Sequence, residues 1–281
     1  MNKQLTLGVA YMISAQFMFT IMAACVRGLR ELPFIEIVGV RSVSGLLLFG
    51  TYMTWQGVSF RGRHRGDLLW RGCVGFMALI AHYYSITHVP LATATLLANT
   101  APLLVAVLAA IFLHEALKFS VVLLILLSLF GVYLLVSPEL HISRLGYAAG
   151  IAASVLIAGS FFFIRKLKHE HPCTVAFYFV AVSSIGSTPF AVQAWVWPSQ
   201  QQWLLLLGVA ISAFFAQLWL TRSFQLGKAA VISVMSYSGP VFAWLLGFFW
   251  FGEVLTGSAL LGAGLVLASG VMFVLLERRP S

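Results

Sequence analysis

Charged residues are scarce in this sequence. They make up 9% of the 281 residues and only 8 of them are Asp or Glu, whereas 60% of the residues are hydrophobic. A soluble globular domain carries about 25% charged residues. So few charges cannot cover a water-exposed surface, and the mean hydropathy of +0.96 indicates lipid as the main solvent. In lipid every backbone polar group needs an internal partner, which leaves helices or closed barrels.

The sequence motifs of common catalytic and metal sites are also missing. The three cysteines, Cys25, Cys73 and Cys173, are an odd number and lack metal-site spacing. The sequence holds no GxSxG, no HExxH and no P-loop. We therefore expect no catalytic residue, no metal and no cofactor. An intramembrane enzyme built on His82 and the serines remains an alternative.

Long apolar runs are what the sequence has instead. They are about 18 to 24 residues long, which suits membrane-spanning helices rather than barrel strands. The connections between them are short and hold most of the charge, so the net charge of +9 does not indicate nucleic-acid binding. We predict an all-α integral membrane protein with ten transmembrane helices, near residues 5–26, 34–54, 68–87, 91–113, 119–137, 146–164, 173–194, 203–221, 229–251 and 257–276.

A repeat with an offset of 138 residues runs through the chain. It aligns residues of scarce types, namely Pro102 with Pro240, Glu115 with Glu253 and Arg27 with Arg165. We therefore predict two five-helix units, 1–138 and 139–281. Because five is odd, the second unit begins on the opposite side of the membrane, which gives two inverted repeats, a plan found in many transporters.

The basic residues are divided unequally between the two sides of the predicted bundle. Of 17 Lys and Arg, 13 fall on the side of the N-terminus, 3 fall on the other side, and Arg41 lies within a helix. Cytoplasmic loops carry such an excess. We therefore predict that both termini are cytoplasmic and that the chain lies in a bacterial cytoplasmic (inner) membrane. The residues on the N-terminal side are Lys3, Arg61, Arg63, Arg65, Arg71, Lys118, Arg165, Lys166, Lys168, Arg222, Lys228, Arg278 and Arg279.

Pro102 and Pro240 each lie near the middle of a predicted helix. A proline there removes a backbone hydrogen bond and leaves the carbonyl of Ala98 or Ser236 without its usual donor. In lipid that carbonyl needs a neighbouring donor or water. Because the prolines occupy equivalent positions of the repeat, we predict a pair of functional hinges, with a packing kink as the alternative.

Neutral polar and aromatic residues share faces or depths with the two prolines. Polar groups that face lipid are costly, so we expect these side chains to line a central cavity that binds a small polar metabolite. The alternative is helix-to-helix hydrogen bonding, which small polar residues often supply. The candidate cavity residues are Gln16, His82, Tyr83, Thr95, Asn99, Ser154, Ser160, Gln217, Trp219, Ser233, Ser236 and Tyr237.

Arg41 is the one basic residue well inside a predicted helix, about 12 Å from Pro33 along the axis. Ionisable groups inside a membrane are functional candidates by default. Two interpretations stay open for Arg41: structural pairing, and a place on the route of anionic groups. Glu115 and Glu253 lie near helix ends, where we expect each carboxylate to contact the first turn of the following helix.

Three stretches resemble the EamA-type transporters of the drug/metabolite transporter superfamily. They are HYYSITHVPLATATLLANTAPLLVAVLAAIFLHEAL (82–117), RSFQLGKAAVISVMSYSGPVFAWLLGFFWFGEVL (222–255) and PFIEIVGVRSVSGLLLF (33–49). The resemblance implies a ten-helix bundle with inverted halves, cytoplasmic termini and a central substrate cavity. Small multidrug-resistance relatives use a carboxylate in their first helix. This chain has Gln16 there, so their exchange mechanism does not carry over.

The sequence therefore predicts a secondary transporter that moves amino acids or related metabolites, as an exporter, by alternating access. Its expected partners are a small-molecule substrate and the lipid bilayer, and it is expected to be a monomer or a homodimer. A membrane receptor or scaffold without transport is the second alternative. The sequence leaves the substrate and the coupling ion open.

Overall fold

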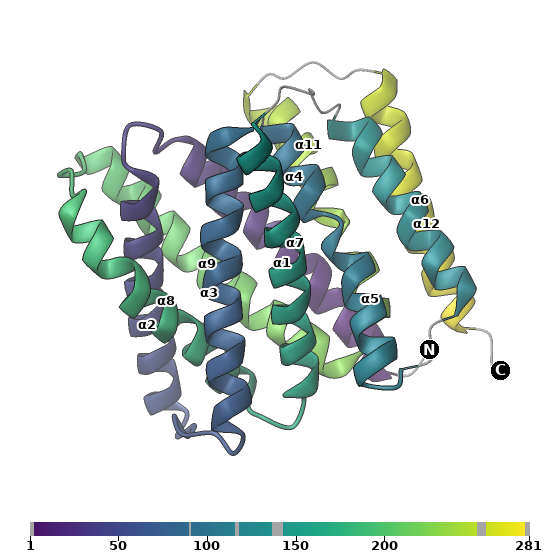
Figure 1. The fold of residues 1–281 in the computed structure, drawn as a ribbon, viewed down its shortest axis with the longest axis horizontal. Helices are drawn as coiled ribbons and strands as arrows, with labels where there is room; N and C mark the ends of the chain where they lie inside the picture. The colour runs from purple at the N-terminus through teal and green to yellow at the C-terminus, as the bar shows by residue number, and fades with distance from the viewer. Residues whose placement is uncertain (1–2, 90, 116–117, 137–142, 252–256, 279–281) are drawn as a thin grey trace.

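The computed structural model describes residues 3–89, 91–115, 118–136, 143–251 and 257–278. Within these ranges every regular element is a helix, and Figure 1 shows them as one bundle, with α6 and α12 side by side at its edge. The helices are α1 (Lys3–Arg27), α2 (Phe34–Trp55), α3 (Arg65–His88), α4 (Leu91–Ala98), α5 (Ala101–Phe112), α6 (Phe119–Val136), α7 (Arg144–Lys166), α8 (Pro172–Gln193), α9 (Gln200–Leu226), α10 (Ala229–Met235), α11 (Ser238–Phe251) and α12 (Gly257–Arg278).

Six helical stretches in the described part of the chain are long and apolar enough to cross a membrane. They are α1, α2, α7, α8, α9 and the interrupted span Ala229–Phe249. Shorter apolar helices cover Leu96–Phe112, Phe119–Leu134 and Gly257–Met272. The all-helical membrane architecture is therefore confirmed, and the count of ten spans stays a prediction.

Two expected helices, 91–113 and 229–251, are each broken once. α4 ends before Asn99 and α5 begins at Ala101, and the break between α10 and α11, residues 236–237, falls within one residue of the equivalent positions of the second half. Pro102 and Pro240 therefore lie in the first turns of α5 and α11. Backbone N–H groups in a first turn have no intrahelical acceptor, so a proline there removes no bond. The prediction of mid-helix prolines is wrong, because each helix ends before its proline; their role as hinges stays a prediction.

The helices of the two halves pack in reciprocal pairs. α1 packs on α9 as α3 packs on α7, while α2 packs on α8 and α6 on α12. α11 likewise contacts α1 as α5 contacts α7, and α5 meets α10 near the centre. Two five-helix units related by a two-fold axis would produce this pattern. The division into 1–138 and 139–281 stays a prediction.

Small residues allow the close approach of α7 to the first half. A Cβ built on Gly150 would lie 2.5 Å from Leu97 Cδ1 and 2.8 Å from Ser85 Oγ. A larger residue would force the Leu97 and Ser85 side chains to shift, so a glycine favours the close packing of α7 on α3 and α4. This close packing brings α7 beside the break that follows α4, where Thr100 Oγ1 lies 2.9 Å from Ser154 Oγ.

Candidate substrate site

The two helix breaks meet one another at the centre of the bundle. The fully buried hydroxyl of Tyr237, beside the break between α10 and α11, donates to the backbone carbonyl of Asn99 over 2.9 Å. These residues are 138 positions apart, so equivalent points of the repeat are in contact. The Ser233 hydroxyl lies 3.3 Å from the carbonyl of Pro102 and 2.9 Å from that of Ala230.

Other hydroxyls complete the backbone bonding around the breaks. The Ser236 hydroxyl donates to the carbonyl of Ser233 over 2.6 Å. The Thr100 hydroxyl lies 2.7 Å from the carbonyl of Leu97 and 2.9 Å from Ser154 Oγ on α7. Carbonyls freed by a broken helix inside lipid need donors of this kind. Four of the predicted cavity residues therefore form hydrogen bonds within the protein in this conformation, namely Ser154, Ser233, Ser236 and Tyr237.

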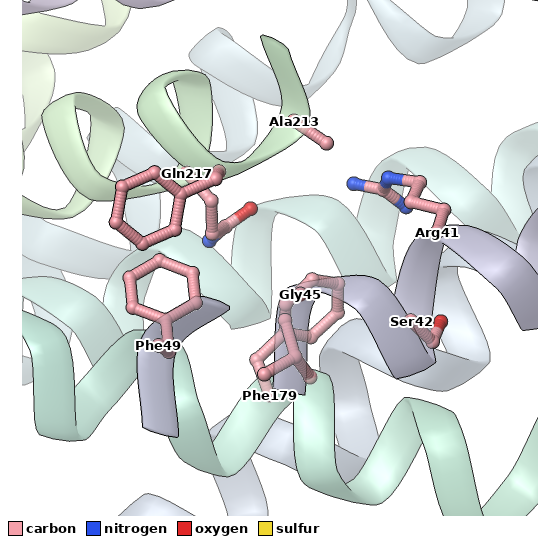
Figure 2. A pocket seen from close by; sticks show the side chains of 9 residues that line it. Arg41, Ser42, Gly45, Phe49, Phe179, Ala213 and Gln217 are labelled. Atoms are coloured by element: carbon pink, nitrogen blue, oxygen red, sulfur yellow. The ribbon is translucent and has the colours of Figure 1, made fainter. Parts of the chain in front are cut away.

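A separate pocket lies between α2, α8 and α9. Its cavity volume is about 10 Å³, room for about one water molecule. Figure 2 shows the side chain of Arg41 extending from α2 toward the segment of α9 that carries Ala213 and Gln217. The lining residues are Arg41, Ser42, Gly45, Phe49, Phe179, Val180, Ala213, Phe214 and Gln217.

Arg41 and Gln217 bring unpartnered hydrogen-bond donors to this pocket. Nε of Arg41 and Nε2 of Gln217 are enclosed and have no hydrogen-bond partner. Tyr83, on α3, is close enough to interact electrostatically with Arg41, and its ring stacks on Phe34 with centroids 5.7 Å apart. Of the predicted candidates, the structure therefore brings Arg41, Gln217 and Tyr83 to one region.

A second buried arginine escaped the sequence analysis. Arg71, on α3, is 2% exposed, and its Nε and Nη1 have no partner. Its guanidinium lies 4.6 Å from the ring centroid of Phe179, which lines the pocket from α8. The charge count placed Arg71 on the N-terminal side, because it falls in the first turn of the predicted helix 68–87. α3 begins three residues earlier, at Arg65, so Arg71 is about 9 Å along the helix.

The remaining predicted cavity residues are dispersed. Gln16 lies against Gly239, where a Cβ would come within 2.6 Å of its Oε1. His82 has an enclosed Nδ1 without a partner, and Trp219 packs 5.4 Å from the Phe215 ring. Ser160 is buried on α7. The side chain of Thr95 lies outside what the structure describes.

Polar contacts join the two halves at one end of the bundle, here called the basic end, which holds the connections 56–64, 113–115, 167–171 and 227–228. Glu115 Oε1 accepts from Arg165 Nε over 2.7 Å, and its Oε2 accepts from the N–H of Ala229 over 2.9 Å. Arg165 Nη1 also donates to the carbonyl of Gln225 over 3.1 Å. The expected contact of Glu115 with the following helix is wrong, because folding brings it to the N-terminus of α10 instead of α6. Glu253 lies outside the described residues.

Glu170 forms a second connection at the basic end. Its Oε1 accepts from the N–H groups of Arg63 and His64, each over 2.7 Å, and lies 3.1 Å from His64 Nδ1. Burial raises the pKa of Glu170, but the bonds from the His64 and Arg63 amides and from the His64 ring outweigh it, so the pKa is lowered. Lys166 and Asp67 add a more exposed ion pair of 2.8 Å. Glu115, Glu170 and Asp67 are thus each bonded to a residue of the other half at this end.

The model of the EamA-like transporter family matches residues 6–137 and 144–276. The pseudopaline exporter CntI of Pseudomonas aeruginosa is 33% identical over 271 residues, which cover 95% of this chain and 93% of the relative. The S-adenosylmethionine uptake transporter of Rickettsia prowazekii is 24% identical and covers 74% of this chain and 71% of its own. A crystal structure superposes with a TM-score of 0.87 at 19% identity, over 97% and 98% of the two chains, which indicates the same fold.

Proposed function

The chain belongs to the EamA-like transporter family, and on that premise we propose that it is a secondary transporter that exports amino acids or related small polar metabolites. It is a membrane transporter of small molecules by family and by its relatives. Our proposal adds the direction of transport, the class of substrate and the mechanism. The exporter CntI, similar over nearly the whole length of both chains, supports the outward direction.

The observation that carries the mechanism is the meeting of two broken helices between reciprocally packed halves. Alternating access requires two bodies that can rock about a common centre. Helix breaks at equivalent positions offer flexible points there. We assign Pro102 and Pro240 the role of fixing where each second segment begins.

The basic end would be the closed side of the transporter in this conformation, and cytoplasmic. Glu115, Arg165 and Glu170 link elements of opposite halves there. At the other end the described links are a bond from the Val196 N–H to Glu36 Oε2 and one from Gln202 to Glu31. Opening toward the cytoplasm requires the first group of links to part.

The test is transport by the purified full chain in proteoliposomes. Vesicles are loaded with radiolabelled amino acids and related metabolites, and efflux is followed with and without a proton gradient, beside empty vesicles. Saturable efflux of at least one compound is expected. The absence of saturable flux for the whole panel, in both directions, would overturn the transport proposal and favour a receptor or scaffold.

A further inference from the structure

The pocket between α2, α8 and α9 combines a cation with a second donor, both unsatisfied. Arg41 Nε and Gln217 Nε2 are enclosed without partners, on different helices that line the same space. Arg41 lies seven residues into α2, about 10 Å from its start. An enclosed donor that lacks an acceptor loses hydration without compensation. These two donors therefore favour a ligand that supplies acceptor oxygens.

No described carboxylate neutralises this cation. Five acidic side chains are described, and each accepts a hydrogen bond from a residue other than Arg41 or Arg71, although Glu36 Oε1 is itself enclosed without a partner. Glu31 accepts from Gln202, Glu36 from Val196, Asp67 from Lys166, Glu115 from Arg165 and Glu170 from Arg63 and His64. Within the described part of the chain, Arg41 and Arg71 form no ion pair. Both carry their charge into the bundle uncompensated, which is unfavourable unless another anion is bound.

The surroundings strengthen this preference for an anion. The rings of Phe49 and Phe214, 4.5 Å apart, and that of Phe179 form apolar walls. Charge–charge attraction is stronger among such walls than in water. Arg71 stands behind Phe179, 4.6 Å from its centroid, and adds a second positive charge. Figure 2 shows Phe179 and Phe49 below Arg41 and Gln217 in this view.

We infer that this pocket binds the carboxylate of the transported substrate, an inference that rests on the proposed transport function. Arg41 presents the planar fork that matches a carboxylate, and the Gln217 amide is the second donor. The aromatic walls accommodate the apolar part of an amino-acid-like molecule. At about 10 Å³ the pocket is contracted, so α2, α8 and α9 separate when the substrate enters.

The test compares free amino acids with their carboxamides, which keep the shape and lose the negative charge. Wild-type protein in proteoliposomes is expected to prefer the free acid by about 10-fold or more, as for a hydrogen-bonded charge. Arg41→Gln should bring the ratio close to one. Lys168→Gln, which removes an exposed positive charge outside the pocket, should leave it unchanged. Equal flux of acid and carboxamide in the wild type, or a preserved preference in Arg41→Gln, would overturn the inference.

A second variant separates binding from folding. Gln217→Glu places a carboxylate on the pocket wall, where it competes with the substrate for Arg41. Free-acid transport should fall by about 10-fold, while thermal stability stays the same or rises. A fall in both would contradict the assignment and support a packing role for Gln217.

Binding without transport is measured on the same preparations. Free acids should raise the melting temperature of the detergent-solubilised wild type more than carboxamides do, and Arg41→Gln should abolish that difference. Acid-specific stabilisation without flux would refute transport and retain the site. Flux without any distinction between acid and carboxamide would retain transport and refute the site.

Discussion

The guanidinium groups of Arg165 and Arg41 stand in opposite situations. Arg165, at the basic end, donates to the Glu115 carboxylate and to the carbonyl of Gln225. Arg41, in the pocket, has an enclosed Nε with no acceptor and no described ion pair. A buried charge that is paired, such as that of Arg165, stabilises the packing of the two halves seen here. A buried charge without a partner destabilises the ligand-free protein, and it is retained where a bound ligand supplies the partner.

Removing the partner of Arg165 should have the largest effect on stability. Glu115→Gln takes the negative charge from a mostly buried pair, with side chains 14% and 13% exposed. We expect the free energy of unfolding in detergent micelles to fall by roughly 3 kcal/mol, since it leaves a buried charge unpaired. Asp67→Asn is the matched control in a more exposed pair, and roughly 0.5 kcal/mol or less is expected there. Equal losses in both variants would mean that Glu115 is no more important than a surface ion pair.

The second largest loss of stability is expected on removing the hydrogen bond between the two helix breaks. Tyr237→Phe removes the donor to the Asn99 carbonyl and leaves that carbonyl buried. A loss of about 2 kcal/mol is expected. Tyr178→Phe loses a similar bond, 3.0 Å from its hydroxyl to the carbonyl of Arg61, at an exposed position where water replaces it. A loss of about 0.5 kcal/mol is expected there, and unfolding of the two variants side by side measures the difference.

Arg41→Gln should change stability in the opposite direction to Arg165→Gln. Removing an uncompensated charge relieves its desolvation, so the free energy of unfolding should rise by about 1 kcal/mol. Removing the paired Arg165 should lower the free energy of unfolding, because the mostly buried Glu115 carboxylate then loses its cation. Calorimetry on the substrate-free protein measures both. A destabilisation on losing Arg41 would show that it is a structural residue.

The smallest expected effect is the pH dependence of stability that arises from Glu170 at the basic end. The pKa of Glu170 is lower in the folded protein than its ordinary value. The stability from this group is therefore present above the unfolded pKa, about 4.3 for Glu, and is lost as the pH falls through the folded pKa. Melting temperatures of the wild type and Glu170→Gln should converge over this acidic range. A constant gap between them down to pH 3 would contradict the assignment.

The sequence located the breaks without revealing their form. The repeated prolines identified the right positions, because proline is favoured in the first turn of a helix, where its missing N–H breaks no bond. The partner of Tyr237 could not be predicted, since the carbonyl of Asn99 reaches it only once two distant helices pack together. The same reason explains the error at Glu115, whose acceptor role is toward Ala229, a residue 114 positions away.

Charge placement was predictable only in part. Arg41 was identified because it interrupts an apolar run far from either end. Arg71 was missed because it falls in the first turn of the predicted helix 68–87 and was counted with the charges at that end, whereas α3 begins at Arg65 and Arg71 is buried. Helix boundaries are the least certain part of a sequence-based assignment, and here that uncertainty decides which arginines count as intramembrane.

The contact of Tyr237 with Asn99 also bears on how such a chain can diversify. In a symmetric homodimer a residue on the two-fold axis faces its own copy, and every mutation appears twice. In a single chain that carries both copies of the repeat, each position can change alone. Tyr237 and Asn99 differ at equivalent positions of the 138-residue offset, a difference that two identical chains could not encode.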